Sequence, residues 1–168
     1  PEPMSVLLLG IDSGSLGRTE VGRSDVIMVM TINPNKNNIT LTSIPRDTYV
    51  EIVGLGIMDK INHAYAFGGI EMSRATVEQF LGIAIDHYMV VNMAGLSELI
   101  DQVGGVEVIP PSTFSINGYN FVEGQTINLN GEMALAYVRE RYSSGGDYGR
   151  QERQRQLVTA VIRQVSNS

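Results

Sequence analysis

The 168-residue chain contains no cysteine and no tryptophan, and only two of its twelve basic residues are lysine. The absence of cysteine excludes disulfide frameworks, thiolate metal sites and cysteine nucleophiles. No apolar run approaches the roughly 20 residues that a membrane-spanning helix needs; the longest, such as Val6–Leu9 and Val26–Met30, have the length of strands. Hydrophobic residues still make up 43% of the chain, which is enough to bury a core and excludes a disordered protein.

The ten arginines are distributed unevenly. Six of them lie between positions 139 and 163 with only three acids, so that this segment carries a net charge of +3, whereas the rest of the chain carries −9. An acidic chain with one basic segment does not fit a general nucleic-acid binder. Because the planar guanidinium matches phosphate and carboxylate groups, the segment predicts a local site for a specific anion.

Apolar runs of strand length alternate with segments of helical spacing, which predicts an α/β fold whose sheet is covered by helices. Strands are expected at 6–11, 26–32, 39–44, 87–91 and 106–109, and helices at 72–81, 93–103, 132–141 and 148–165. The turn cluster 33–38 makes the second and third strands an antiparallel hairpin. No linker or repeat is evident, so a single domain over 1–168 is expected.

Charged residues of the N-terminal third fall at the ends of these strands. Asp12 follows the first strand, Arg23 and Asp25 stand at the start of the second, and Arg46 and Asp47 follow the third. Ligands of open α/β sheets bind at such strand ends. Two hard carboxylates, Asp12 and Asp25, suit Mg²⁺ or Mn²⁺, which use phosphate oxygens as further ligands.

The arginines of the C-terminal quarter fall at helix ends. Arg139 and Arg141 close one helix, while Arg150 and Gln154 share a face at the start of the next, with Arg153 beside that face and expected to serve it. The positive end of the helix dipole also favours phosphate. A single exposed arginine is more often a solvated charge, and the isolated His63 and His87 are expected to be structural. The convergence of the charges is what predicts a phosphate site.

Seven segments in this order resemble the LytR-CpsA-Psr family of cell-wall glycopolymer transferases. They are LLLGID (7–12), GRSDVIMV (22–29), SIPRDTYV (43–50), KINHAYAFGG (60–69), VGGVEV (103–108), LNGEMALAYVRER (129–141) and GDYGRQERQRQ (146–156). The resemblance covers about residues 5–165. It implies an α-β-α sandwich with a mixed, twisted central sheet.

The resemblance also implies a function. Members transfer a glycopolymer phosphate, such as teichoic acid or capsule polysaccharide, from a polyprenyl-pyrophosphate carrier to peptidoglycan on the extracytoplasmic face of the membrane. This chain, which lacks an initiator methionine, is therefore expected to be the catalytic domain without its N-terminal membrane anchor. Mg²⁺ or Mn²⁺ is the expected cofactor.

Residue roles follow from the same motifs. The resemblance assigns metal binding to Asp12 and Asp25. It assigns pyrophosphate binding to Arg23, Arg46, Lys60, Arg139, Arg141, Arg150 and Gln154. Catalysis is expected of Asp25, Arg46, Arg139 and Arg141, with Asp25 or Asp47 as the base for the acceptor hydroxyl. Apolar residues of the helices at 72–81 and 93–103 are expected to line a pocket for the polyprenyl tail.

Two other functions are compatible with the same residues. A pyrophosphatase would use the same arginines with water in place of the sugar hydroxyl. A non-catalytic module that binds polyprenyl phosphates or anionic glycans would need the arginines and the apolar pocket but not the two aspartates. Nucleic-acid binding is disfavoured by the net charge of −9 on the chain outside residues 139–163, and by the lack of a stripe of aromatic and basic residues.

Overall fold

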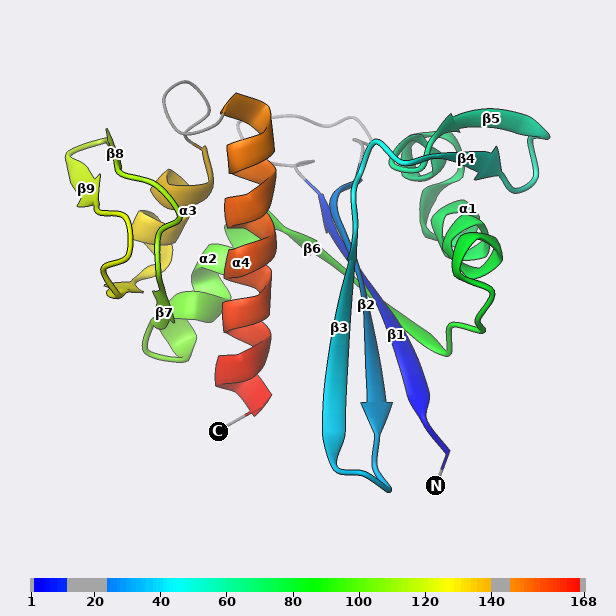
Figure 1. The fold of residues 1–168 in the computed structure, drawn as a ribbon, viewed down its shortest axis with the longest axis horizontal. Helices are drawn as coiled ribbons and strands as arrows, with labels where there is room; N and C mark the ends of the chain where they lie inside the picture. Colours follow the sequence, from blue (N-terminus) through cyan, green and yellow to red (C-terminus); the bar gives the residue numbers. More distant parts are fainter. Residues whose placement is uncertain (1, 12–23, 140–145, 167–168) are drawn as a thin grey trace. The chain divides into compact units, whose positions relative to one another are not determined.

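A four-stranded mixed sheet forms the centre of the N-terminal part of the chain (Figure 1). The computed structural model describes residues 2–11, 24–139 and 146–166. The strand order is β3-β2-β1-β6, with β2 antiparallel to both β1 and β3 and with β6 parallel to β1. The strands are β1 (Met4–Ile11), β2 (Ser24–Asn33), β3 (Asn38–Ile44) and β6 (His87–Asn92). The predicted β2–β3 hairpin is confirmed.

The burial of each strand follows its place in the sheet. Strand β1 is central and is buried from Val6 to Ile11, so it reads as one continuous apolar run. Strand β3 is at the edge, and its Thr-rich sequence leaves most of its side chains exposed. In the turn between β2 and β3, Asn33 Oδ1 accepts bonds from the backbone N–H groups of Asn35 at 3.1 Å and Lys36 at 3.3 Å.

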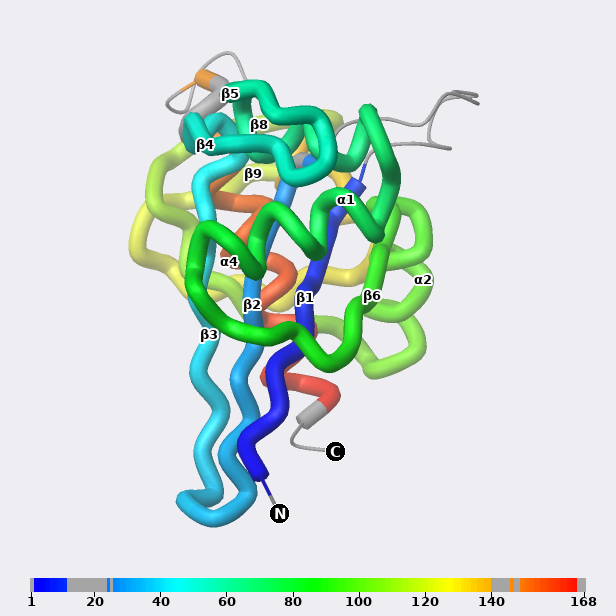
Figure 2. The backbone as a smooth tube through the Cα atoms, turned by 90° about the vertical axis from the view of Figure 1, so that its right-hand side faces the viewer, coloured from blue at the N-terminus to red at the C-terminus, as the bar shows by residue number. Residues whose placement is uncertain are grey.

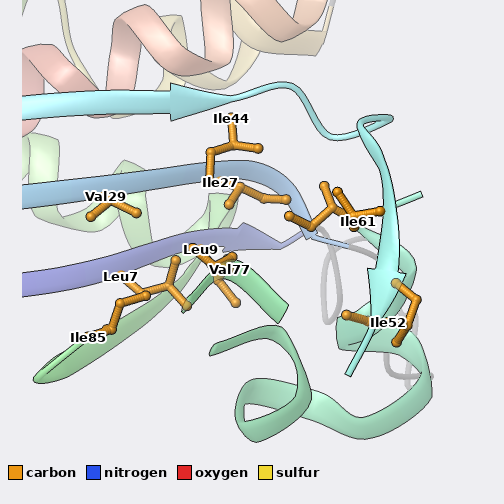
Figure 3. Packing of buried hydrophobic residues seen from close by; sticks show 11 residues of the cluster. Leu7, Leu9, Ile27, Val29, Ile44, Ile52, Ile61, Val77 and Ile85 are labelled. Carbon is orange, nitrogen blue, oxygen red and sulfur yellow. The ribbon is translucent and has the colours of Figure 1, made fainter. Parts of the chain in front are cut away.

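Helix α1 (His63–Leu81) packs across one face of this sheet, as Figure 2 shows. It begins nine residues before the predicted helix at 72–81 and is kinked at Gly68 and Gly69, whose φ/ψ values are −145°/16° and 68°/−154°. Figure 3 shows the core beneath it, where Val77 packs with apolar side chains of β1 and β2. Val77 is therefore a core residue, with its side chain almost fully buried.

A short hairpin precedes α1. The sequence predicts only an extended piece at 49–53 and a glycine turn, whereas the structure pairs β4 (Tyr49–Ile52) antiparallel with β5 (Ile57–Lys60). Its inward side chains include Val50 and Ile52, which are buried in the same core. This packing orders a segment whose sequence pattern is too short to show a period.

The C-terminal part of the chain consists of three helices and short strands. The elements are α2 (Met93–Gln102), β7 (Val106–Val108), β8 (Phe114–Ile116), β9 (Tyr119–Phe121), β10 (Ile127–Leu129), α3 (Gly131–Arg139) and α4 (Gly146–Ser166). Strands β8 and β9 form a hairpin whose turn residues Asn117 and Gly118 both have positive φ, as the Asn-Gly sequence predicts. Strand β10, which pairs with β7, is not predicted by the sequence.

The chain divides after Asn92 into two compact units, residues 1–92 and 93–168. The first holds the mixed sheet with α1, and the second holds α2, α3 and α4 with their short strands. A mixed α/β fold is thus confirmed. Among the described residues, no helix combines the length and the hydropathy needed to cross a bilayer.

Candidate functional site

Arg46 lies in a tight turn directly after β3. The Thr48 N–H donates to the Pro45 carbonyl at 3.1 Å, and the Thr48 hydroxyl donates to the same oxygen at 2.6 Å. The Arg46 carbonyl accepts a 3.0 Å bond from the backbone N–H of Asn62. Arg46 itself is half-buried. The turn thus fixes the backbone of a predicted phosphate-binding arginine through hydrogen bonds of the main chain and of Thr48.

The segment that contains Lys60 runs alongside this turn. The N–H of Ile61 donates to the Thr48 carbonyl at 2.8 Å, one residue before the bond between Asn62 and Arg46. Lys60 is exposed at the end of β5. The structure therefore brings the backbones of the SIPRDTYV and KINHAYAFGG motifs together, with Arg46 and Lys60 near their junction.

Asp59 and His63 form an ion pair beside Lys60. The Asp59 Oδ1 and His63 Nδ1 atoms are 3.0 Å apart, and the two residues are four positions apart in the sequence. The hydrogen bond from His63, together with that from the Lys60 N–H, holds the pKa of Asp59 below its usual range. The other ring nitrogen of His63, Nε2, is buried and has no hydrogen-bond partner. His63 thus has a structural contact at the start of α1, in line with the structural role expected from the sequence.

The aspartates predicted to bind a metal flank the ends of β1 and β2. Ile11, which precedes Asp12, is the register partner of Ser24, which precedes Asp25. Ser24 is fully buried and its hydroxyl has no hydrogen-bond partner, so an oxygen donor is unsatisfied at this strand end. Asp12 and Arg23 lie outside the described residues, as does the side chain of Asp25. A hydroxyl oxygen is among the oxygen ligands that Mg²⁺ accepts.

Arg139 ends α3 and is exposed. The helix begins with the predicted cap: the Asn130 Oδ1 accepts a 2.9 Å bond from the Met133 N–H. Arg141, predicted to act with Arg139, lies outside the described residues. Helix α3 packs against α4, whose first turns carry Arg150 (Figure 1).

Arg150 and Gln154 lie one turn apart near the start of α4. Arg150 is half-buried, whereas Gln154 is only 4% exposed and its Oε1 has no hydrogen-bond partner. A buried, unsatisfied amide is costly unless a ligand bonds to it. The unbonded atom is an acceptor, so it would bond to a donor group rather than to a phosphate oxygen.

Arg153 corrects one expectation. It does not serve the open face beside Arg150, because its side chain is 0% exposed. Its Nε donates to the Tyr137 carbonyl at 2.8 Å, and its guanidinium lies 4.6 Å from the centre of the Phe114 ring. Of the two remaining arginines of α4, Arg163 is exposed, while Arg155 is half-buried and pairs with Glu152.

The described site residues fall into two groups. The first unit carries Arg46 and Lys60 on adjoining backbone segments, and the second carries Arg139, Arg150 and Gln154 at the ends of two packed helices. Within the described part of the chain, no three acidic or histidine side chains gather in a cluster fit for a metal ion. The sequence does not indicate that Arg153 is buried. It also does not single out the Asp59–His63 pair, for which the separation of four residues is the one available signal.

Comparisons with known proteins agree with these motifs. The whole chain, residues 1–168, matches the LytR_cpsA_psr family. A relative from Enterococcus faecalis, named polyisoprenyl-teichoic acid–peptidoglycan teichoic acid transferase TagU, is 55% identical over 165 residues, which are 98% of this chain and 54% of the relative. The chain spans about half the length of the curated relatives it matches.

Two solved structures of a more distant relative carry ligands. The LytR-CPS2A-psr family protein YwtF (TagT) with bound octaprenyl pyrophosphate lipid aligns with a TM-score of 0.76 at 32% identity, over 98% of this chain and 65% of that one. TagT bound to LIIa-WTA aligns with a TM-score of 0.77 at 33% identity, over 98% and 64%.

Proposed function

Because the chain belongs to the LytR_cpsA_psr family, we propose that it transfers a teichoic-acid-type glycopolymer phosphate from a polyprenyl-pyrophosphate carrier to peptidoglycan. The donor class is supported by the lipid pyrophosphate and the LIIa-WTA bound to TagT. The acceptor is supported by the name of the E. faecalis relative, with which the chain shares 55% identity. Such a reaction takes place outside the cytoplasmic membrane, and we place the protein there.

The observation that carries the proposal is the fixed placement of cations at element ends. Arg46 stands on a hydrogen-bonded turn, and Arg139 and Arg150 stand on packed helices. A pyrophosphate carries several negative oxygens and needs charged donors that do not have to reorganise. We assign the phosphates to Arg23, Arg46, Lys60, Arg139, Arg141 and Arg150, with Gln154 supplying an amide donor.

The reaction is a displacement at phosphorus. A hydroxyl of the acceptor sugar attacks the glycopolymer-side phosphorus, the bond from that phosphorus to the bridging oxygen breaks, and polyprenyl phosphate leaves. The hydroxyl proton passes to a carboxylate, for which Asp25 and Asp47 are the candidates. Arg46, Arg139 and Arg141 neutralise charge on the bridging and equatorial oxygens as the bond breaks, which is the main catalytic demand of phosphoryl transfer.

A divalent cation completes the proposed site. Asp12 and Asp25 would hold Mg²⁺ or Mn²⁺, beside the unsatisfied Ser24 hydroxyl. The ion would supply Lewis-acid stabilisation of the phosphate oxygens. The chain's own carboxylates would hold it through hard oxygen ligands, and the arginines would bind the remaining phosphate charge.

The polyprenyl tail needs an apolar pocket. Two helices are expected to line this pocket. In α1, Val77 is buried in the core, whereas Phe80 is exposed and remains a candidate. In α2, the apolar side chains Met93, Leu96 and Ile100 are buried. We therefore assign the tail to apolar residues of these helices that are at least partly exposed, such as Phe80 and Leu99, rather than to their buried ones.

The proposal is tested by product analysis on a lipid-linked glycopolymer. With peptidoglycan present, the expected product is a covalent glycopolymer–peptidoglycan conjugate together with polyprenyl phosphate. Release of free glycopolymer phosphate at an equal rate with and without peptidoglycan would instead identify a pyrophosphatase. Tight binding of the lipid with no turnover in Mg²⁺ or Mn²⁺ would identify a non-catalytic binding module.

A further inference from the structure

Arg153 is the largest side chain that the structure buries completely. Burying a guanidinium is unfavourable unless hydrogen bonds and favourable charge interactions compensate for the lost hydration. Two contacts do so here: Nε donates to the Tyr137 carbonyl at 2.8 Å, and the cation lies 4.6 Å from the centre of the Phe114 ring. A residue kept at this cost has a specific partner, and that partner is the end of α3.

The carbonyl that Arg153 bonds belongs to the last turn of a helix. Helix α3 ends at Arg139, so Tyr137 is among the final residues whose carbonyls have no intrahelical donor. The negative end of the helix dipole lies at the same place and favours a cation. Arg153 therefore acts as a C-terminal cap that comes from a different helix.

The side chain of Tyr137 is held by α4 as well. Its hydroxyl donates to Gln156 Oε1 at 2.5 Å, and Gln156 Nε2 donates to the Ile109 carbonyl at 2.7 Å. Burial raises the pKa of the Tyr137 phenol, so it remains a donor at neutral pH. Arg153 and Gln156 lie one turn apart on α4 and bond to the same residue, Arg153 to the Tyr137 carbonyl and Gln156 to the Tyr137 hydroxyl.

We call the bonds of Arg153 and Gln156 to Tyr137 the clamp. On each of the two helices that it joins, a predicted phosphate-binding arginine lies nearby in sequence. Arg139 follows Tyr137 by two residues at the end of α3, and Arg150 precedes Arg153 by one turn on α4. Figure 1 shows the two helices side by side in the C-terminal unit. The clamp thus ties together the two helices that carry these cations, at positions close to each cation in sequence.

We propose that Arg153 is a positioning residue: it fixes the end of α3 against α4 so that Arg139 is held at the pyrophosphate that Arg150 binds. It does not touch the substrate itself. This inference rests on the proposed function, because the pyrophosphate ligand is part of that proposal.

The variants are Arg153→Met, which keeps the buried volume but loses the Nε donor and the charge, and Arg153→Lys, which keeps the charge. Arg155→Met is the matched control, because it removes a guanidinium from the same helix whose partner is Glu152 rather than α3. Binding of octaprenyl pyrophosphate in detergent micelles is measured by calorimetry, well below the melting temperature of each variant. Each binding experiment is repeated with Arg139→Ala added.

In the native background, Arg139→Ala should weaken binding about ten- to a hundredfold, as expected for a lost charge-assisted contact. In the Arg153→Met background, the same change should cost about twofold or less, because Arg139 no longer reaches the ligand. Arg153→Lys should keep an intermediate effect of Arg139→Ala, and Arg155→Met the full one. An equal effect of Arg139→Ala in all backgrounds would overturn the positioning role, even if Arg153→Met lowered the melting temperature.

Hydrogen exchange provides a readout that needs no ligand. In Arg153→Met and Arg153→Lys, amide exchange around 137–139 should accelerate relative to the capped first turn at Met133 and Ala134, and it should not do so in Arg155→Met. Unchanged exchange would refute the clamp. If the native protein fails to bind octaprenyl pyrophosphate, the proposed function fails and the role of Arg153 at that site fails with it, while hydrogen exchange still decides whether the clamp exists.

Discussion

At the residue scale, Arg46 offers the most direct test of the phosphate site. The bond that ties the turn to Asn62 uses the Arg46 carbonyl, which an alanine retains. Arg46→Ala should therefore lower transfer about ten- to a hundredfold while the melting temperature stays near that of the native protein. Transfer assays and thermal unfolding measure the two quantities. Arg163→Ala, which removes an exposed arginine from the last turns of α4, is the control and should change neither.

The Asp59–His63 pair makes a second residue-scale prediction, which concerns stability. The folded-state pKa of Asp59 lies below its ordinary value of 3.8, so its charged form stabilises the fold above that value. This contribution is lost as the pH falls through the lowered pKa. Asp59→Asn should lower the melting temperature slightly at neutral pH, and the difference from the native protein should shrink as the pH falls through the lowered pKa and vanish at a pH below it. A difference that persisted unchanged at that pH would show that the ion pair is not its source.

At the scale of elements, the sequence pattern predicts the strands of the main sheet better than the helix that covers it. Strand β1 is a continuous apolar run and β2 and β3 flank an evident turn, so local sequence and burial agree. The sequence pattern predicts helix α1 only over 72–81, because Gly68 and Gly69 interrupt that pattern. Packing on the sheet, rather than propensity, extends the helix across this kink.

The kink itself can be tested at Gly69. Its φ/ψ of 68°/−154° lies in a region that is essentially restricted to glycine. Gly69→Ala should therefore lower the free energy of unfolding by about 1–3 kcal/mol, although a Cβ there would meet no atom within 4 Å. Urea unfolding measures this. Gly82→Asn is the matched control, because Gly82 caps the same helix in the left-handed region that asparagine tolerates, and it should cost much less. Equal losses would mean that the kink is not strained.

Part of the candidate site is evident from the sequence and part is not. The charges at element ends were visible because elements end at recognisable residues, such as Asn130 before α3. The burial of Arg153 was not visible, because its position beside Arg150 and Gln154 on the helix looks like that of any surface arginine. It is a core residue because the Phe114 ring and the Tyr137 backbone carbonyl are brought to it from other elements.

At the scale of the whole molecule, the charge distribution bears on metal dependence. A chain of net charge −6 that binds a pyrophosphate must offset repulsion between two sets of negative groups, and carboxylates at Asp12 and Asp25 would add to it without a cation. Chelation with EDTA should therefore abolish most transfer, and added Mg²⁺ or Mn²⁺ should restore it, whereas Ca²⁺, with its longer ligand distances, should restore less.

Asp25→Ala should respond to the metal differently from Arg46→Ala. If Asp25 holds the ion, its loss should raise the Mg²⁺ concentration needed for half-maximal transfer, while Arg46→Ala should lower the rate without shifting that concentration. Titration of Mg²⁺ against the transfer rate of each purified variant measures both effects, with Arg163→Ala as the common control. Full transfer by the native protein in excess EDTA would remove the metal from the reaction and leave the arginines as its sole electrostatic support.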